Sequence, residues 1–167
     1  RIVACTRNAY KNNFLKTQAN FGSLDLEQIN MFDEENLRHV IKNSNIVINT
    51  IGVLHEKNKK NSFKNIHVLL PDIISKLCNE YKVEKLIHLS ALGIEQSTDS
   101  DYALSKLEGE KVILNNFNKS IVIRPSIIFS RDDKFTTKFM SMLSILPIFP
   151  IYYNGLTKFQ PIYCGDL

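Results

Sequence analysis

Residues 90–106 read SALGIEQSTDSDYALSK, and the fold prediction starts from this stretch. Ser90 follows an apolar run at residues 85–89, and Tyr102 and Lys106 stand four positions apart. If a helix begins near residue 101, Tyr102 and Lys106 lie one turn apart on the same face. The stretch therefore predicts a strand, a loop and a helix, with three polar side chains at one place.

These three side chains can do proton chemistry. An ammonium beside a phenol favours the phenolate, so Lys106 is expected to lower the pKa of Tyr102 from its usual value of ~10. A tyrosine of this kind exchanges a proton with a carbonyl or alcohol at neutral pH. Ser90 would hydrogen-bond the same oxygen. The pattern indicates a reductase or dehydrogenase site with Ser90, Tyr102 and Lys106 as catalytic residues.

Short apolar runs alternate with amphipathic segments along the rest of the chain. Strands are expected at residues 1–6, 23–29, 45–50, 85–89 and 120–123. Helices are expected at residues 33–41, 62–77, 101–115 and 134–146, with Pro71 kinking the second and weaker helical character at 9–17. The strands are continuous apolar runs, which is typical of a parallel sheet covered on both faces. The predicted fold is α/β, a Rossmann-like doubly wound parallel sheet.

A glycine-rich phosphate-binding turn is missing from this sequence, because no G-x-G-x-x-G occurs. If residues 1–6 form the second strand of the order 3-2-1-4-5-6, the first strand and its turn lie upstream. We therefore expect residues 1–167 to be a partial NAD(P)-binding domain, with the start of a substrate or C-terminal region from about residue 131. Since the first strand is central in that order, this piece alone is predicted not to fold stably.

Polar and small residues follow the predicted strands. In an open parallel sheet, ligands bind at the carboxyl ends of the strands. The predicted cofactor-binding residues are Thr6, Arg7, Asn30, Met31, Thr50, Ile51, Gly52, Ser90, Tyr102, Lys106 and Pro125.

Some of these positions have two interpretations. Arg7, where an acidic residue would bind a ribose hydroxyl, can hold a 2′-phosphate or can be a solvated surface arginine. The first interpretation predicts NADP(H) in preference to NAD(H). Asn30 and Met31 can contact an adenine or can form a simple turn into the helix cap at Asp33.

Composition excludes several other classes. The net charge of +4 is spread along the chain, so no nucleic-acid site is expected, and the KNKK run at residues 57–60 is read as a solvated loop. Cys5 and Cys78 lie in apolar stretches, which predicts buried thiols in a reducing compartment. There is no metal-ligand spacing and no apolar run of membrane-spanning length. His67 and His88 are expected to be core or helix-surface histidines.

Several motifs together resemble an atypical, extended short-chain dehydrogenase/reductase. In particular they resemble the NAD(P)-binding accessory subunit family of respiratory complex I (alpha-subcomplex subunit nine) and its bacterial homologues. The motifs are ACTRN at residues 4–8, NTIG at 49–52, LSALG at 89–93, YALSKLEGE at 102–110, RPSIIF at 124–129, RDDKF at 131–135 and KFQPIYCGD at 158–166.

The resemblance implies a bound NADPH with a structural role in a peripheral subunit of complex I. It implies other complex I subunits as partners, and peripheral membrane association through the full assembly. The expected location is the matrix side of the mitochondrial inner membrane, or the bacterial cytoplasm and inner membrane face. Ser130 and His67 depart from the family pattern, which often has glycine and asparagine there.

Two other functions stay open at this point. The first is an active NADP-dependent reductase or epimerase that uses Tyr102 as acid and base. The second is a regulator, similar to sugar-nucleotide or isoflavone-reductase-like proteins, that senses NADP. The sequence contains the catalytic groups and so does not exclude the active enzyme.

Overall fold

The computed structural model describes residues 1–131, 133–146 and 152–167 and has the predicted α/β architecture. Its strands are β1 (Ile2–Thr6), β2 (Leu24–Gln28), β3 (Ile46–Asn49), β4 (Lys85–Leu89), β5 (Ser120–Ile123), β6 (Ile128–Phe129) and β7 (Ile162–Tyr163). Its α-helices are α1 (Glu34–Lys42), α2 (Leu70–Glu80), α3 (Asp101–Asn116) and α4 (Lys134–Ile145). Shorter helical segments are η1 (Asn13–Gln18), η2 (Lys64–Leu69), η3 (Ile94–Gln96) and η4 (Tyr152–Gly155).

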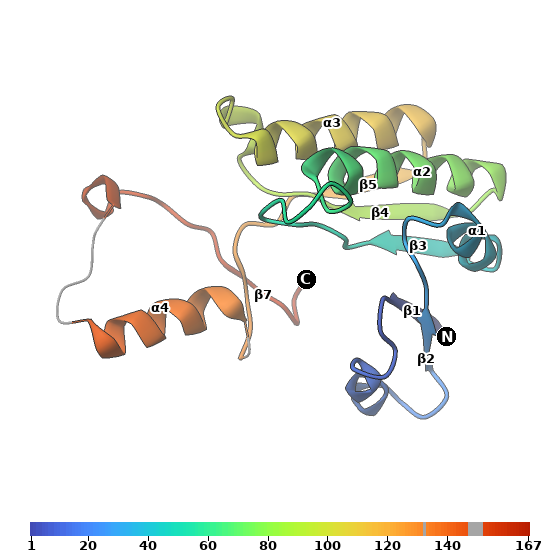
Figure 1. The fold of residues 1–167 in the computed structure, drawn as a ribbon, viewed down its shortest axis with the longest axis horizontal. Helices are drawn as coiled ribbons and strands as arrows, with labels where there is room; N and C mark the ends of the chain where they lie inside the picture. Colours follow the sequence, from blue (N-terminus) through green and yellow to red (C-terminus); the bar gives the residue numbers. More distant parts are fainter. Residues whose placement is uncertain (132, 147–151) are drawn as a thin grey trace.

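The strands pair in parallel, as the continuous apolar runs predicted. β1 pairs with β2, β3 pairs with β4 and β4 pairs with β5, while β6 and β7 form a separate pair. Within the part of the chain that the structure describes, no strand joins β1 to β3, and the two sheets stand apart (Figure 1). This arrangement agrees with the order 3-2-1-4-5-6 with its first strand left out.

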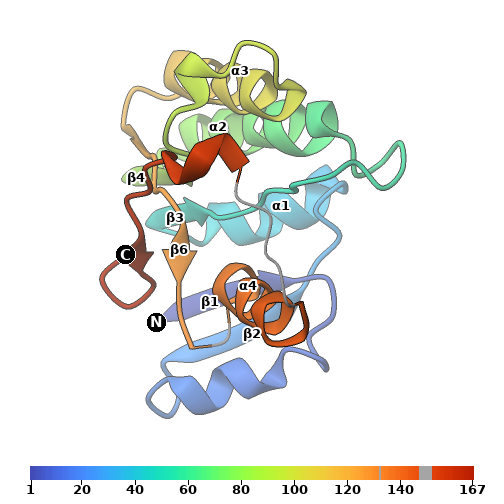
Figure 2. The same ribbon diagram turned by 90° about the vertical axis from the view of Figure 1, so that its left-hand side faces the viewer.

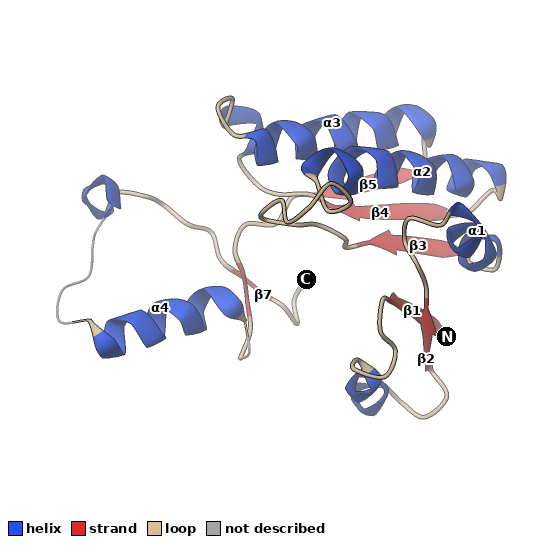
Figure 3. Cartoon of the chain, viewed as in Figure 1, coloured by secondary structure: helices blue, strands red, loops and turns tan. Residues whose placement is uncertain are grey.

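The hydrophobic core lies on one face of the β3–β4–β5 sheet. Helices α2 and α3 lie side by side over that face (Figures 1 and 3), and α1 packs against α2. The buried apolar side chains come from these helices, from β4 and from the turn after β2, and they include Met31, Leu37, Ile66, Leu70, Leu86 and Ile113. The core therefore fixes the turn after β2 relative to the Tyr–Lys helix α3.

The opposite face of the same sheet is uncovered, which corrects the prediction of a sheet buried on both faces. Ile46 and Ile48 of β3 are 52% and 61% exposed, and Ile2 of β1 is 60% exposed. Cys5 is also exposed, contrary to its predicted burial, whereas Cys78 is buried as expected. No strand of the described residues joins β1 to β3, and in Figure 2 helices α2 and α3 lie above β3 and β4, whereas β1 and β2 lie apart below them.

The predicted helix over residues 62–77 is instead a π-turn, η2, followed directly by α2. The Leu70 N–H donates to the Asn65 carbonyl, five residues back, which is the π-helical pattern. Pro71 thus falls in the first turn of α2, where a missing N–H is tolerated. The expected irregularity is present, but it lies before the proline rather than at it.

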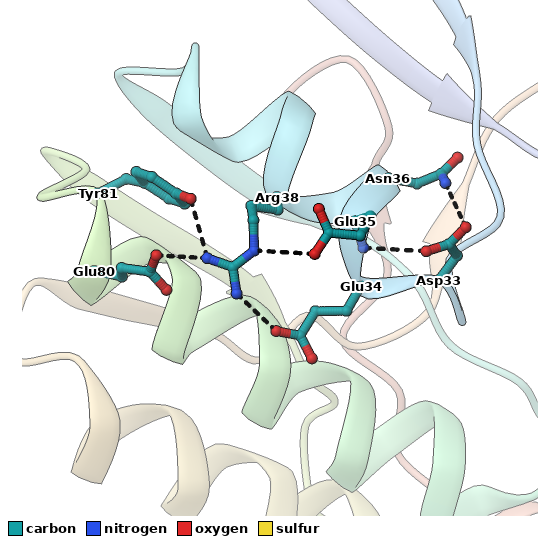
Figure 4. A network of polar contacts seen from close by, with 7 residues as sticks. All are labelled: Asp33, Glu34, Glu35, Asn36, Arg38, Glu80 and Tyr81. Atoms are coloured by element: carbon teal, nitrogen blue, oxygen red, sulfur yellow. Dashed lines mark hydrogen bonds and ion pairs between the residues drawn. The ribbon is translucent and has the colours of Figure 1, made fainter.

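A polar network holds α1 against the end of α2 (Figure 4). Arg38 donates to Glu34 at 2.9 Å and to the Tyr81 hydroxyl at 3.0 Å, and it pairs with Glu80. Asp33 caps α1 as predicted, since its carboxylate accepts the Glu35 N–H at 3.1 Å. Partly exposed ion pairs stabilise little, so we read this network as fixing the orientation of α1 and of the turn that leads into it.

Helix α4 stands away from the sheet (Figure 1). Asp133 caps it, accepting the N–H groups of Phe135 and Thr136 at 2.8 and 2.6 Å. The Phe135 ring meets that of Phe159 with 6.3 Å between centroids. Both rings line a cavity beside the ends of β4 and β5, so residues beyond β6 return to the sheet edge there.

Candidate functional site: a cleft at the strand ends

A first cavity of about 300 Å³ opens where β1, β2 and β3 end. Because parallel strands present their carboxyl ends at one edge, residues far apart in sequence meet there. It is lined by Cys5, Thr6, Arg7, Ile29, Met31, Thr50, Ile51, Gly52, Val53, Asn61 and Ile66. Six of the predicted cofactor-binding residues, Thr6, Arg7, Met31, Thr50, Ile51 and Gly52, thus share one cavity.

Asn30 does not line this cavity. Its side-chain oxygen accepts the Phe32 N–H at 3.2 Å, and its carbonyl accepts the Asp33 N–H at 3.0 Å. These bonds make Asn30 part of the turn into the α1 cap at Asp33, as the second of its two interpretations predicted, rather than an adenine contact. Met31 is 8% exposed and belongs both to the core and to the cavity wall.

A second cavity, of about 940 Å³, lies beside the ends of β4 and β5. Ser90, Tyr102 and Pro125 line it together with apolar side chains that include Ile94, Ile127, Phe135 and Phe159. The loop and helix of residues 90–106 therefore bring Ser90 and Tyr102 to one wall, whereas Lys106, the third predicted member, does not line this cavity.

Lys106 lines neither cavity, but it lies beside Gly52 of the first cavity and bonds to Leu89, which precedes Ser90 of the second. It is 5% exposed, and its Nζ donates to the Leu89 carbonyl at 3.0 Å. A Cβ placed on Gly52 would lie 3.3 Å from this Nζ, so the backbone at Gly52 runs directly beside the ammonium. The lone glycine allows this approach, and a larger residue there would press on Lys106.

The predicted lowering of the Tyr102 pKa is wrong. Burial raises the pKa of the Tyr102 phenol, and burial also lowers the pKa of the Lys106 ammonium. The ammonium is directed at the Leu89 carbonyl, where it does not act as a partner that favours the phenolate. In this geometry Tyr102 is a protonated hydrogen-bond donor at neutral pH.

Ser90 lines the second cavity, and Glu110 is buried behind it. Ser90 is 7% exposed, and its Oγ has no hydrogen-bond partner of regular geometry within the described chain. It nevertheless lies close enough to Glu110 to help lower the pKa of that carboxyl group. Burial alone would raise the pKa of Glu110, but the Arg124 guanidinium holds it below its usual range. Two guanidinium nitrogens of Arg124 contact the carboxylate at 3.0 and 2.6 Å.

Sequence reasoning did not assign Glu110, Arg124, Ser105 and His67 to the site. Glu110 stands one helical turn after Lys106, but it pairs with Arg124, 14 residues further along the chain, and no helical spacing rule indicates that pair. His67 contacts Ser105 at 2.9 Å and Val53 at 3.1 Å, across 38 and 14 residues of sequence. No local pattern reveals contacts of that range.

The parallel α/β fold and the cavities at its strand ends are those of a Rossmann-like domain of the dehydrogenase type. The family model described as "NAD dependent epimerase/dehydratase family" matches residues 1–146. The chain therefore belongs to the NAD dependent epimerase/dehydratase family.

Individual proteins show the same likeness. The chain is 31% identical over 167 residues to NADH dehydrogenase (ubiquinone) 1 alpha subcomplex subunit 9, mitochondrial, of Mus musculus, covering 99% of this chain and 44% of that protein. The chain thus spans less than half the length of that relative. The dTDP-glucose 4,6-dehydratase DesIV of Streptomyces venezuelae, with NAD bound, has a TM-score of 0.77 at 14% identity, covering 99% of this chain and 59% of its own. The triphenylmethane reductase of Citrobacter sp., with NADP(H), has a TM-score of 0.59 at 17% identity, covering 76% and 40%.

Neither a membrane-spanning helix nor a metal cluster is found in the described residues. Among the helices of residues 1–131, 133–146 and 152–167, none combines the length and the apolar character that crossing a bilayer requires. The same residues contain no group of three or more His, Cys, Asp or Glu side chains placed to hold a metal ion.

Proposed function

We propose that this chain is the nucleotide-binding part of an accessory subunit of respiratory complex I, where it holds NADPH in a structural role. The similarity to the mitochondrial alpha subcomplex subunit 9 of the mouse supports this proposal. Other complex I subunits would be its partners. Its place would be the matrix side of the mitochondrial inner membrane or the equivalent face of a bacterial membrane, with peripheral membrane contact through the whole assembly.

The observation that carries the proposal is Arg7 at the mouth of the first cavity. Arg7 is exposed at the end of β1, and within the described residues it takes part in no ion pair. Its guanidinium is therefore available for a phosphate, and the neighbouring Thr6 adds a hydroxyl. The cavity walls Met31 and Ile51 would bind the adenine, and Ser90, Tyr102 and Lys106 would bind the nicotinamide end.

A bound nucleotide supplies hydride chemistry in related folds, but here it needs only to stabilise. A ligand present at a hundredfold excess over its Kd stabilises the folded state by about 2.7 kcal/mol. That contribution would favour the assembled subunit without any turnover. The half-buried, protonated Tyr102 fits a binding role, since a phenol donates a hydrogen bond without changing its charge.

The full-length protein tests this directly. We expect denaturation to release NADP(H) rather than NAD(H), as identified by chromatography and absorbance. Arg7→Glu should weaken NADPH binding about 10- to 100-fold, because a charged phosphate contact becomes repulsive. Lys16→Glu on η1 makes the same charge change away from the cavity and should leave binding unchanged. Release of NAD(H), or full NADPH binding by R7E, would contradict the proposal.

A second candidate function is an active NADP-dependent reductase or epimerase. Ser90 and Tyr102 on one cavity wall favour it, because these groups can bind and protonate a substrate oxygen. Tyr102→Phe in the full-length protein separates the two functions. If the role is structural, Y102F assembles normally and there is no turnover to lose. If wild-type protein turns over a carbonyl or sugar-nucleotide substrate and Y102F loses this with assembly intact, the enzymatic function replaces the structural one.

A further inference from the structure

We propose that His67 is a positioning residue of this cleft, which ties the loop after β3 to the helix that carries Tyr102 and Lys106. The inference rests on the proposed function as an NADP(H) site. His67 itself lines neither cavity. It acts through the backbone at Val53 and through Ser105.

The hydrogen bonds fix one tautomer of the imidazole. Nε2 lies 3.1 Å from the Val53 N–H and must accept from it. Nδ1 lies 2.9 Å from Ser105 Oγ, and that hydroxyl donates its hydrogen to the Tyr102 carbonyl at 2.8 Å. Nδ1 therefore carries the proton and donates to Ser105. Both ring nitrogens are satisfied in a single state, so the bridge is rigid.

The bridge reaches the two places where a nucleotide would be held. Val53 and Gly52 line the first cavity, and a Cβ on Gly52 would lie 3.8 Å from His67 Nε2 and 3.3 Å from Lys106 Nζ. The Tyr102 ring meets the His67 ring edge-on, with 5.4 Å between centroids. The loop at Gly52 and Val53, the Lys106 ammonium and the Tyr102 ring thus all lie close to the His67 imidazole.

Packing within η2 and against α3 also fixes the position of the His67 imidazole. His67 is 1% exposed and lies within the π-turn η2, and π-turns concentrate at functional sites. Its ring stacks on Phe63 at 5.4 Å and an interplanar angle of 20°. Its carbonyl faces Gly109 so closely that a Cβ there would lie 1.9 Å away. The backbone of η2 and the ring both have little room to move.

The other buried histidine lacks this arrangement. His88 Nδ1 contacts Asn49 Nδ2 at 3.1 Å, and His88 Nε2 makes no hydrogen bond within the described residues. It connects two strands of one sheet, and it contacts no loop of the first cavity. The bridging role therefore belongs to His67 in particular, rather than to buried histidines in general.

The test uses full-length protein and three variants. His67→Phe keeps a planar ring and loses both hydrogen bonds, whereas His67→Gln keeps an acceptor oxygen and a donor nitrogen. His55→Gln, in the exposed loop after β3, is the control. NADPH affinity is measured by titration calorimetry, and the Val53 amide is followed by hydrogen exchange.

We expect H67F to weaken NADPH binding about tenfold and to raise Val53 exchange by a similar factor, as the loss of a buried hydrogen bond predicts. H67Q should stay within about threefold of wild type on both measures, and H55Q should match wild type. If H67F does not fold, Ser105→Ala serves instead. It frees the ring at Nδ1 and should raise Val53 exchange about threefold.

The outcomes separate this inference from the proposed function. If wild-type protein binds neither nucleotide, the proposed function fails. If wild-type protein binds NADPH and H67F binds it equally with Val53 still protected, the positioning role is overturned. It is also overturned if H67Q is as impaired as H67F, because retained hydrogen-bonding groups would then not restore the role. The same holds if S105A leaves Val53 exchange unchanged when H67F cannot be obtained.

Discussion

His67 and His88 are both about 1% exposed, in the part of the protein where Lys106 and Glu110 are also buried. Burial, together with the nearby Lys106 ammonium, lowers the pKa of each imidazole to about 4. The folded state therefore holds both histidines neutral. In the unfolded chain they take up protons near pH 6.5.

This difference predicts a loss of stability in acid. Because the folded pKa lies below the unfolded one, the unfolded state binds more protons between pH 6.5 and pH 4, and stability falls as pH falls through that window. Each buried histidine should remove about 2 kcal/mol between pH 6.5 and pH 5. We expect H67Q to show a flatter dependence of unfolding free energy on pH in denaturant titrations of the full-length protein. A slope as steep as that of wild type and H55Q would contradict this.

At the scale of residues, the sequence predicted the strand-end positions better than the charge interactions. Six cofactor candidates met in one cavity because strand ends follow from apolar runs. The effect of Lys106 on Tyr102 was mispredicted, because helical spacing places two side chains on one face without saying which acceptor the ammonium takes. The role of His67 depends on contacts with Val53 and Ser105 that no spacing rule contains.

At the scale of elements, Gly109 sets the distance between α3 and η2. A Cβ at this position would lie 1.9 Å from the His67 carbonyl oxygen, which is backbone and cannot move aside cheaply. Gly109→Ala should therefore destabilise the protein by about 3 kcal/mol, as overpacking does. In an unconstrained helix interior the same change would stabilise by about 1 kcal/mol. Unfolding by denaturant measures the difference.

The matched control is Glu108→Ala, one residue earlier on the exposed side of α3. It should change the unfolding free energy by less than about 0.5 kcal/mol. A stabilised G109A would show that α3 and η2 do not pack as closely as described.

Capping residues and apolar periodicity predicted where helices begin and end better than they predicted the kind of helix or the presence of a short strand. The helix expected at residues 101–115 is α3, Asp101–Asn116, and Asp33 caps α1 as expected. The π-turn was missed because its extra residue is accommodated by tertiary packing against α3 and by Pro71, not by local propensity. The two-residue β6 strand was missed because its partner β7 lies 34 residues further on.

At the scale of the whole molecule, the uncovered sheet face predicts that the isolated 167-residue chain does not unfold in a single cooperative transition. Ile2, Ile46 and Ile48 are each more than half exposed, and β1 and β3 have free facing edges within the described chain. Exposed apolar strands with open edges favour association and local opening. Calorimetry of the isolated 167-residue chain should show a broad, weak transition. A sharp cooperative transition would contradict this.

The parallel α/β fold was predictable, because continuous apolar strands alternating with amphipathic helices allow few other arrangements. How the two sheets stand relative to each other was not, since it depends on packing between segments far apart in sequence. The boundary of a second region near residue 131 stays a prediction.

The π-turn has a consequence for how relatives of this chain can differ in length. The π-turn η2 contains one residue more than an α-helical turn would. This extra residue rotates the segment before η2 relative to helix α2, which follows it. Deleting one residue from Lys64–Leu69 would restore a continuous α-helix but turn the N-terminal segment by about 100°. Phe63 and the loop from Val53 would then lose their register with His67. Insertions and deletions should therefore gather in the exposed loop before Ser62, while η2 keeps its length.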